Sequence, residues 1–274
     1  MSVEVKVVMG TRTSSVTRRS LAQRMQAVEP SSTLAITATA AELRAKGIDV
    51  LSFSAGEPDF ETPAHIRAAA QAALDRGETR YTPAAGIPAL REAIAKGVRA
   101  RLGIEWTGAN VVVTVGAKQA LYEAFAATLD PGDEVLVVTP YWVSYPDQIR
   151  LVGGTPVFVK TDESTRFQPT LESLRAHTTS RTKAIVYSSP GNPTGTVFDE
   201  ETLGSIAAWS RETGAFIVSD EIYEALAFVR PHRSILHVAP DIDARVLPIS
   251  GLSKSYAMTG WRIGYVVAHR DLAE

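Results

Sequence analysis

Short β-branched, apolar runs alternate with helix-like stretches through most of this chain, and this alternation constrains its fold more than any other feature. Continuous apolar strands are typical of a sheet that is buried on both faces. Strands of this kind, separated by helices, predict a mostly parallel sheet sandwiched by helices, which is an α/β domain. We expect strands at 111–115, 134–139, 156–160, 184–188, 215–219, 246–250 and 264–268, and helices at 34–46, 63–76, 87–101, 117–128, 170–177 and 199–213.

Composition excludes several other kinds of protein. The 274 residues carry 28 basic and 30 acidic side chains, a net charge of −2, so no basic surplus favours nucleic acid or an anionic membrane as a partner. No apolar run approaches the ~18–20 residues of a membrane span. The chain has no cysteine and five scattered histidines, so we expect no disulfide, thiol chemistry or metal site. It also lacks the glycine-rich loops of nucleotide-binding domains.

The first residues, 1–19, contain three arginines, several Ser and Thr residues and one acid, Glu4. A transit peptide has a composition of this kind. We interpret the segment as a solvated N-terminus instead, and we expect a cytoplasmic protein.

Polar and aromatic residues gather where the predicted strands end, which is where ligands bind in open parallel sheets. Singly, each has an ordinary explanation as a turn residue, a core aromatic, a helix cap or a surface lysine. Their convergence on one sheet edge favours a site for an anionic, aromatic, electrophilic molecule. The residues are Gly116, Ala117, Lys118, Trp142, Asn192, Asp220, Tyr223, Ser253 and Lys254.

One of these strand ends carries a long motif, GLSKSYAMTGWRIG at 251–264. It resembles the lysine segment of class I aminotransferases, which use pyridoxal 5′-phosphate (PLP). The resemblance extends from about Leu21 over nearly the whole chain, and it is greatest to the bacterial aspartate aminotransferases. It includes SAGEPDF at 54–60, YTPAAG at 81–86, SPGNPTG at 189–195 and SDEIY at 219–223. The resemblance implies the large domain of a fold type I PLP enzyme at 63–274, after an N-terminal arm and part of a small domain at 1–62.

The resemblance also implies a role for each residue around the cofactor ring. Lys254 forms a Schiff base with the PLP aldehyde and later moves a proton as a general base and acid. Asp220 pairs with the pyridine nitrogen and keeps it protonated, so that the ring withdraws electrons. Tyr223 and Asn192 donate hydrogen bonds to the phenolic oxygen, and Trp142 stacks on the ring face.

For the cofactor phosphate, the resemblance implies donors from several parts of the chain. The backbone N–H groups of Ala117 and Lys118 lie at a helix start, Ser253 adds a hydroxyl, and Arg262 adds a charge-assisted pair. Tyr81 matches a tyrosine that reaches the site from the partner subunit. We therefore expect a homodimer with a shared active site.

For the substrates, the resemblance implies an amino acid and a 2-oxo acid. Gly56 matches a position whose backbone approaches the substrate α-carboxylate, and Trp142 and Asn192 adjoin the same region. Lys118, with Thr33, matches residues that contact the distal carboxylate of acidic substrates. We therefore expect transamination between aspartate, or another acidic amino acid, and 2-oxoglutarate.

Relatives of this kind continue beyond the position of Glu274, and their C-terminal part carries the arginine that binds the substrate α-carboxylate. We therefore expect the 274-residue chain alone to bind PLP poorly or to turn over little. Four alternatives stay open: a prephenate or aromatic aminotransferase, a β-lyase that uses the same lysine, a PLP-binding regulatory module and an inactive fragment. A regulatory module is disfavoured because no basic helix-turn-helix precedes residue 50.

Overall fold

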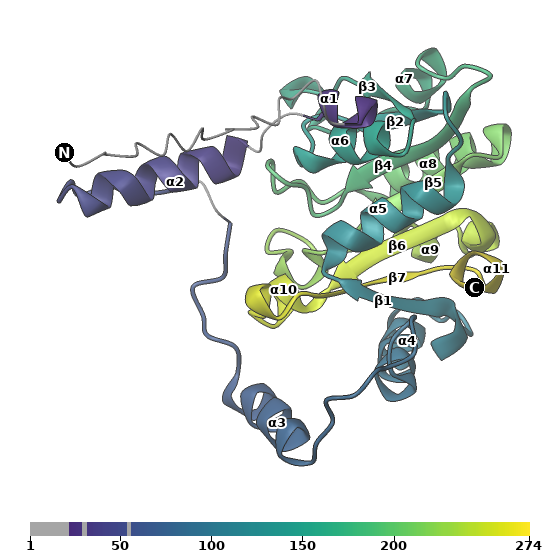
Figure 1. The fold of residues 1–274 in the computed structure, drawn as a ribbon. Coiled ribbons are helices and arrows are strands. Elements are labelled where there is room, and N and C mark those ends of the chain that lie inside the picture. Colours follow the sequence, from purple (N-terminus) through teal and green to yellow (C-terminus); the bar gives the residue numbers. More distant parts are fainter. Residues whose placement is uncertain (1–21, 29–31, 54–55) are drawn as a thin grey trace, which may run out of the picture.

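A computed structural model describes residues 22–28, 32–53 and 56–274. In this part of the chain seven strands form one sheet, in the order β1-β7-β6-β5-β4-β2-β3 (Figure 1). The strands are β1 Val111–Val115, β2 Glu134–Val138, β3 Thr155–Val159, β4 Thr182–Ser188, β5 Phe216–Asp220, β6 Val246–Gly251 and β7 Ile263–Val267. Every predicted strand is confirmed, and the α/β class with them.

Most neighbouring strands are parallel, as the sequence predicts, but β7 is an exception. It pairs antiparallel with β6 on one side and with β1 on the other. The chain turns back directly after β6, so that Gly251 lies opposite Gly264, and a connection this short cannot return the chain for a parallel pairing. This reversal holds Lys254 at the end of β6, at the edge of the sheet where β2, β4 and β5 also end.

The described residues form eleven α-helices, of which only some cover the two faces of the sheet. They are α1 Gln23–Gln26, α2 Ser32–Ala45, α3 Ala64–Asp75, α4 Pro88–Leu102, α5 Ala117–Thr128, α6 Ser144–Leu151, α7 Leu171–Ala176, α8 Glu200–Thr213, α9 Ile235–Val238, α10 Leu252–Ser255 and α11 Arg270–Ala273. The six predicted helices are all present. No helix was predicted at α6, which follows Trp142, or at the four-residue helices α1, α9, α10 and α11.

Two apolar cores explain this layering, because successive side chains of a strand point to opposite faces of the sheet. On one face, strand residues pack against α5 and α6; the members include Val135, Val137, Val186, Val218, Leu121, Phe125 and Ile149. On the other face, strand residues pack against α8; the members include Leu136, Val138, Ile185, Ile217, Leu203, Ile206 and Trp209. The predicted sandwich is therefore confirmed.

Local signals in the sequence set the ends of the main helices. Helix α4 begins at Pro88, whose missing N–H costs nothing at a first helical position, and ends at Gly103 with φ 68°. Helix α8 begins after Asp199, whose carboxylate accepts a hydrogen bond of 2.9 Å from the N–H of Thr202. It ends at Gly214 with φ 75°.

The N-terminal helices differ in where they lie, because α1 contacts α6 on the layered body. Helices α2 and α3 stand apart from the layered body, and an extended segment joins them (Figure 1). The division of the chain at residues 62 and 63 into an arm and a large domain stays a prediction. None of the described helices has the length and apolar character needed to cross a lipid bilayer.

Candidate active site

The carboxyl ends of the strands enclose a cavity of about 730 Å³. Ten of the twelve residues predicted for the site line it together: Gly56, Ala117, Lys118, Trp142, Asn192, Asp220, Tyr223, Ser253, Lys254 and Arg262. The other two do not. Tyr81 is fully exposed outside the cavity. Thr33 lies in α2, and its side chain is outside the described part of the structure.

Asp220 is the last residue of β5 and its side chain is buried. The hydroxyl of Tyr145 donates a hydrogen bond of 2.6 Å to Oδ2, and the N–H of Ile222 donates one of 3.2 Å to Oδ1. Burial raises the pKa of Asp220 to about 6, although both donors act in the opposite direction. Tyr145 was not predicted as a site residue, although it lies only three residues after Trp142 on the unpredicted helix α6.

Lys254 lies in α10, the short helix that follows β6. Its ammonium donates a hydrogen bond to the carbonyl oxygen of Gly56 and lies 5.9 Å from the centre of the Tyr223 ring. Burial lowers the pKa of Lys254, and the nearby charge of Arg262 lowers it further, whereas Glu57 opposes both effects. A lowered pKa increases the fraction of free amine, which is the nucleophilic form of lysine.

The start of α5 and the side chain of Arg262 form a region suited to an anion. The N–H groups of the first helical residues, Ala117 and Lys118, have no partner within the helix. Gly116 precedes them with φ 78°, and a Cβ atom there would overlap the guanidinium of Arg262. A Cβ atom on Gly264 would likewise overlap the backbone of Ala117. The two glycines therefore allow β7 and Arg262 to lie against a helix N-terminus, where partial positive charge gathers.

Aromatic and amide groups line the remaining wall. The ammonium of Lys118 lies 5.0 Å from the centre of the Trp142 ring, and that ring meets Tyr145 edge-on at 5.6 Å. Asn192 donates a long hydrogen bond of 3.4 Å from Nδ2 to the hydroxyl of Tyr223. Burial raises the pKa of Tyr223, so this hydroxyl keeps its proton and can donate it to a ligand.

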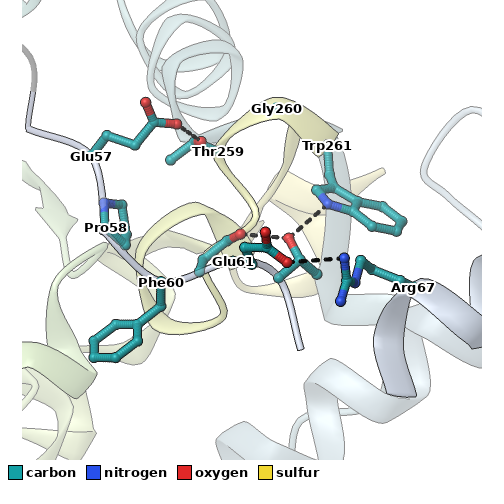
Figure 2. Close-up of a pocket in the computed structure, with 10 residues that line it drawn as sticks. Glu57, Pro58, Phe60, Glu61, Arg67, Thr259, Gly260 and Trp261 are labelled. Atoms are coloured by element: carbon teal, nitrogen blue, oxygen red, sulfur yellow. Dashed lines mark hydrogen bonds and ion pairs between the residues drawn. The ribbon is translucent and has the colours of Figure 1, made fainter. Parts of the chain in front are cut away.

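Residues 56–62, which we call the strap, contact the turn at residues 257–261, which follows the helix that carries Lys254 (Figure 2). Thr62 donates a hydrogen bond of 2.6 Å to the carbonyl oxygen of Ala257 and accepts one of 3.0 Å from the indole of Trp261. Glu57 accepts a hydrogen bond from Thr259. A second cavity of about 480 Å³ lies between the strap and this turn. These contacts, between residues some 200 positions apart, hold Gly56 beside Lys254.

The sheet and the residues at its edge define the large domain of a fold type I protein. A family model described as "Aminotransferase class I and II" matches residues 48–274. The chain belongs to this family, whose members use PLP.

Curated relatives support the same assignment. The chain is 48% identical over 254 residues to the aspartate/prephenate aminotransferase of Thermus thermophilus, a match that covers 93% of this chain and 65% of the relative. It is 48% identical over 253 residues to the aspartate aminotransferase of Geobacillus stearothermophilus, covering 92% of this chain and 64% of the relative. The chain thus spans somewhat less than two thirds of these relatives.

Solved structures have the same fold. The aspartate aminotransferase from Thermus thermophilus with maleate superposes with a TM-score of 0.89 at 47% identity, covering 92% of this chain and 65% of that chain. The aspartate aminotransferase of Thermotoga maritima also gives a TM-score of 0.89, at 43% identity, covering 92% of this chain and 67% of that one.

Proposed function

We propose that the large cavity binds PLP through Lys254 and serves transamination between aspartate, or another acidic amino acid, and 2-oxoglutarate. The observation that carries the proposal is that Lys254 and Asp220 line one cavity with the start of α5. A lysine amine, a buried carboxylate and a helix N-terminus match the aldehyde, the ring nitrogen and the phosphate of PLP in chemical type.

The donor set fits this cofactor at each end. Arg262, Ser253 and the first N–H groups of α5 offer positive charge and hydrogen-bond donors to a phosphate. At the other end, no described lysine, arginine or histidine lies within ion-pair distance of Asp220, so its carboxylate is available to a cationic ring nitrogen. A carboxyl group whose pKa is raised by burial is stabilised in its ionised form when such a cation binds.

When bound, PLP supplies an electron-withdrawing ring that stabilises negative charge on the substrate α-carbon. The residues of this chain then have separable roles. Asp220 holds a proton at the ring nitrogen, while Asn192 and Tyr223 offer donors to the ring oxygen. Lys254, as a free amine of lowered pKa, would accept a proton from the substrate α-carbon at Nζ and deliver it to the cofactor carbon that carried the aldehyde.

Lys118 and Gly56 support the substrate class. The Lys118 side chain is exposed at the mouth of the cavity, where its charge can pair with the distal carboxylate of an acidic substrate. Gly56 offers backbone without a side chain beside Lys254, and Trp142 and Asn192 line the same cavity. We assign Thr33 to the same carboxylate. Relatives named for both aspartate and prephenate favour a prephenate aminotransferase as the second candidate.

A homodimer completes the proposal. Tyr81 is fully exposed, and Phe53 and Phe60 expose most of their surface. A partner subunit would cover such side chains. In that dimer Tyr81 reaches the phosphate in the partner's site. We retain a cytoplasmic location as part of the proposal.

The test is to add PLP to the purified chain and record its absorbance before and after borohydride. We expect a band from lysine-bound cofactor, and a reduced adduct on the peptide that contains Lys254 alone. Lys254→Ala should lose the band, whereas Lys183→Ala, at an exposed lysine of β4, should keep it. A panel of aspartate, prephenate and 2-oxoglutarate, scored for 2-oxo acid against ammonia, separates the aminotransferases from a β-lyase. An adduct spread over several lysines would refute the proposal.

A further inference from the structure

Behind the proposed site, on the opposite side of β5, lies a buried carboxylate that the proposed function does not use. Glu221 follows Asp220 directly, and successive residues of an extended chain point to opposite sides. Its side chain is only 5% exposed. It faces a third cavity, of about 680 Å³, which is separate from the one that holds Lys254.

Three donors surround the Glu221 carboxylate. The hydroxyls of Ser219 and Ser234 donate to Oε1 at 2.9 and 2.7 Å, and Nε2 of His232 donates to Oε2 at 3.3 Å. Burial alone would raise the pKa of Glu221, but these donors outweigh it and lower the pKa below its ordinary value. The carboxylate is therefore held as a buried anion by its hydrogen bonds.

The side chain of His232 makes its hydrogen bond to this carboxylate. Its side chain is 9% exposed, and its Nδ1 atom has no hydrogen-bond partner among the described residues. The contact with Glu221 is thus the polar interaction that orients the ring. Other ionisable groups lie around the pair on several elements, namely Tyr187 of β4, Glu224 of the 3-10 helix Glu224–Leu226, Arg101 of α4, His237 of α9, Tyr265 of β7 and, pointing to the opposite side of the chain, Asp220 of β5.

The backbone of Glu221 connects this network to the proposed site. Its N–H donates to the carbonyl oxygen of Ile249 at 2.8 Å, and its carbonyl accepts from the N–H of Glu224 at 2.9 Å. Residues 220–223 therefore form a turn that is anchored on one side by the Glu221 carboxylate. On the other side the same turn presents Asp220 and Tyr223 to the large cavity.

We propose that His232 is a positioning residue, which holds the Glu221 carboxylate and so fixes the turn that carries Asp220 and Tyr223 into the large cavity. The consequence of this inference rests on the proposed function, because Asp220 and Tyr223 are the two groups that would face the cofactor ring. The fixed turn itself is a property of the chain without any ligand.

A metal ion is the competing explanation for this cluster. Glu221, Glu224 and His232 each place one possible ligand atom within 4.8 Å of the others. However, the Glu221 oxygens already accept three hydrogen bonds, and Glu224 pairs with Arg101 at 3.2 Å. A cation would have to displace these partners, so the network satisfies itself better than it would bind an ion.

Hydrogen–deuterium exchange of the chain without cofactor tests the proposal directly. His232→Leu removes the donor at similar size, and we expect amides in the peptide 219–226 to exchange about tenfold faster, with little change in β2 or β4. His232→Gln keeps an N–H donor and should restore slow exchange. His177→Leu is the matched control, because this histidine contacts only Ser173 within α7 among the described polar groups. Ser219→Ala removes another donor and serves as a milder variant if His232→Leu does not fold.

A second measurement follows the binding of added PLP. His232→Leu should weaken PLP binding by about tenfold and displace the pH midpoint of the lysine-bound absorbance band, whereas His232→Gln and His177→Leu should match the wild-type chain. Equal exchange in the His232→Leu and His177→Leu variants, or no restoration by glutamine, would overturn the proposal. So would a change in wild-type exchange on treatment with EDTA, which would show that a metal holds the cluster. If no lysine-bound band forms in the wild-type chain, the proposed function fails, and the exchange data still decide the role of His232.

Discussion

The hydroxyl of Tyr145 lies 2.6 Å from Oδ2 of Asp220, and it is the one side chain in the described structure that donates a hydrogen bond to this buried carboxylate. The tyrosine comes from α6 and the aspartate from the end of β5, so the contact joins a helix to the edge of the sheet. Burial raises the pKa of Asp220, whereas the tyrosine lowers it. Together with the N–H of Ile222, which also lowers the pKa, these effects set how readily the carboxylate ionises near neutral pH.

Removing the Tyr145 hydroxyl should therefore raise the pKa of Asp220. A hydrogen bond to a charged group contributes about 1.5 kcal/mol, which is about one pKa unit. We expect Tyr145→Phe to move the pKa of Asp220 from about 6 to about 7. The measurement is a pH titration of the chain without cofactor, with ¹³C-labelled aspartate followed by NMR and the Asp220 signal identified by its loss in Asp220→Asn.

The control for this variant is Tyr122→Phe, because Tyr122 is exposed on α5 and has no contact with Asp220. It should leave the titration unchanged. An Asp220 titration that is the same in Tyr145→Phe and the wild-type chain would show that the 2.6 Å contact does not stabilise the anion.

Asp220 should also make the chain less stable at neutral pH when no ligand is bound. Its folded pKa of about 6 lies above its ordinary value of 3.8, so the folded state binds the proton more tightly than the unfolded state. The contribution of Asp220 to stability is therefore largest below pH 3.8 and is lost as the pH rises through about 6. At pH 7.5 the ionised Asp220 should lower the free energy of unfolding by roughly 2–3 kcal/mol, because a difference of one in pKa corresponds to about 1.36 kcal/mol.

Asp220→Asn removes this cost, because asparagine does not ionise. We expect the melting temperature of the cofactor-free chain to rise by several degrees at pH 7.5 and to change little at pH 4. Glu221→Gln is the comparison, since the pKa of Glu221 is lowered and its ionised form stabilises the fold above that pKa. This second variant should lower the melting temperature at pH 7.5. A rise of equal size at both pH values in Asp220→Asn would contradict the ionisation argument.

Much of this architecture could be predicted from local patterns. The bounds of β1 agree with the predicted strand at both ends, because its continuous apolar run stops at a glycine. Lys254 and Asp220 were found because both follow predicted strands, and parallel strands end at a common edge. The resemblance to a known family then added the assignment of Arg262, which strand ends alone do not indicate.

The rest depends on packing that leaves no local pattern. Strand β7 is antiparallel to β6 because the connection between them is short. The apolar residues of a strand do not indicate its direction in the sheet. Thr62 and Ala257 lie 195 positions apart, so no spacing in the sequence indicates their hydrogen bond. The burial of Glu221 has no local pattern either, because the donors that stabilise its carboxylate include His232 and Ser234, which lie more than ten positions further along the chain.

Gly116 offers a test of the anion-binding region. Alanine there must adopt φ 78°, and its Cβ atom would overlap the guanidinium of Arg262. We expect Gly116→Ala to weaken PLP binding by about tenfold, or 1.4 kcal/mol, because the guanidinium must move from the helix start. Gly132→Ala is the matched control, since Gly132 has φ 97° with nothing within 4 Å of a Cβ atom.

Both glycine variants should lose about 1 kcal/mol of stability through backbone strain. Only Gly116→Ala should also lose affinity, measured by titrating PLP against each chain at equal folded fraction. If the two variants bind PLP equally well, Arg262 does not contribute to the phosphate site in its present position.

The exposed lysine at the start of α5 tests the substrate class. Lys118→Met removes the charge but keeps a flexible chain over Trp142, where the ammonium now lies 5.0 Å from the ring centre. We expect aspartate to bind the PLP-loaded chain about tenfold more weakly, since a charge-assisted hydrogen bond contributes roughly 1.5 kcal/mol or more. Alanine, which has no distal carboxylate, should bind within about twofold of its wild-type affinity. The measurement is the change in cofactor absorbance on titration with each amino acid, with Lys183→Met of β4 as the control. Equal losses for aspartate and alanine would mean that the Lys118 side chain acts on the cofactor, and that acidic substrates are selected elsewhere.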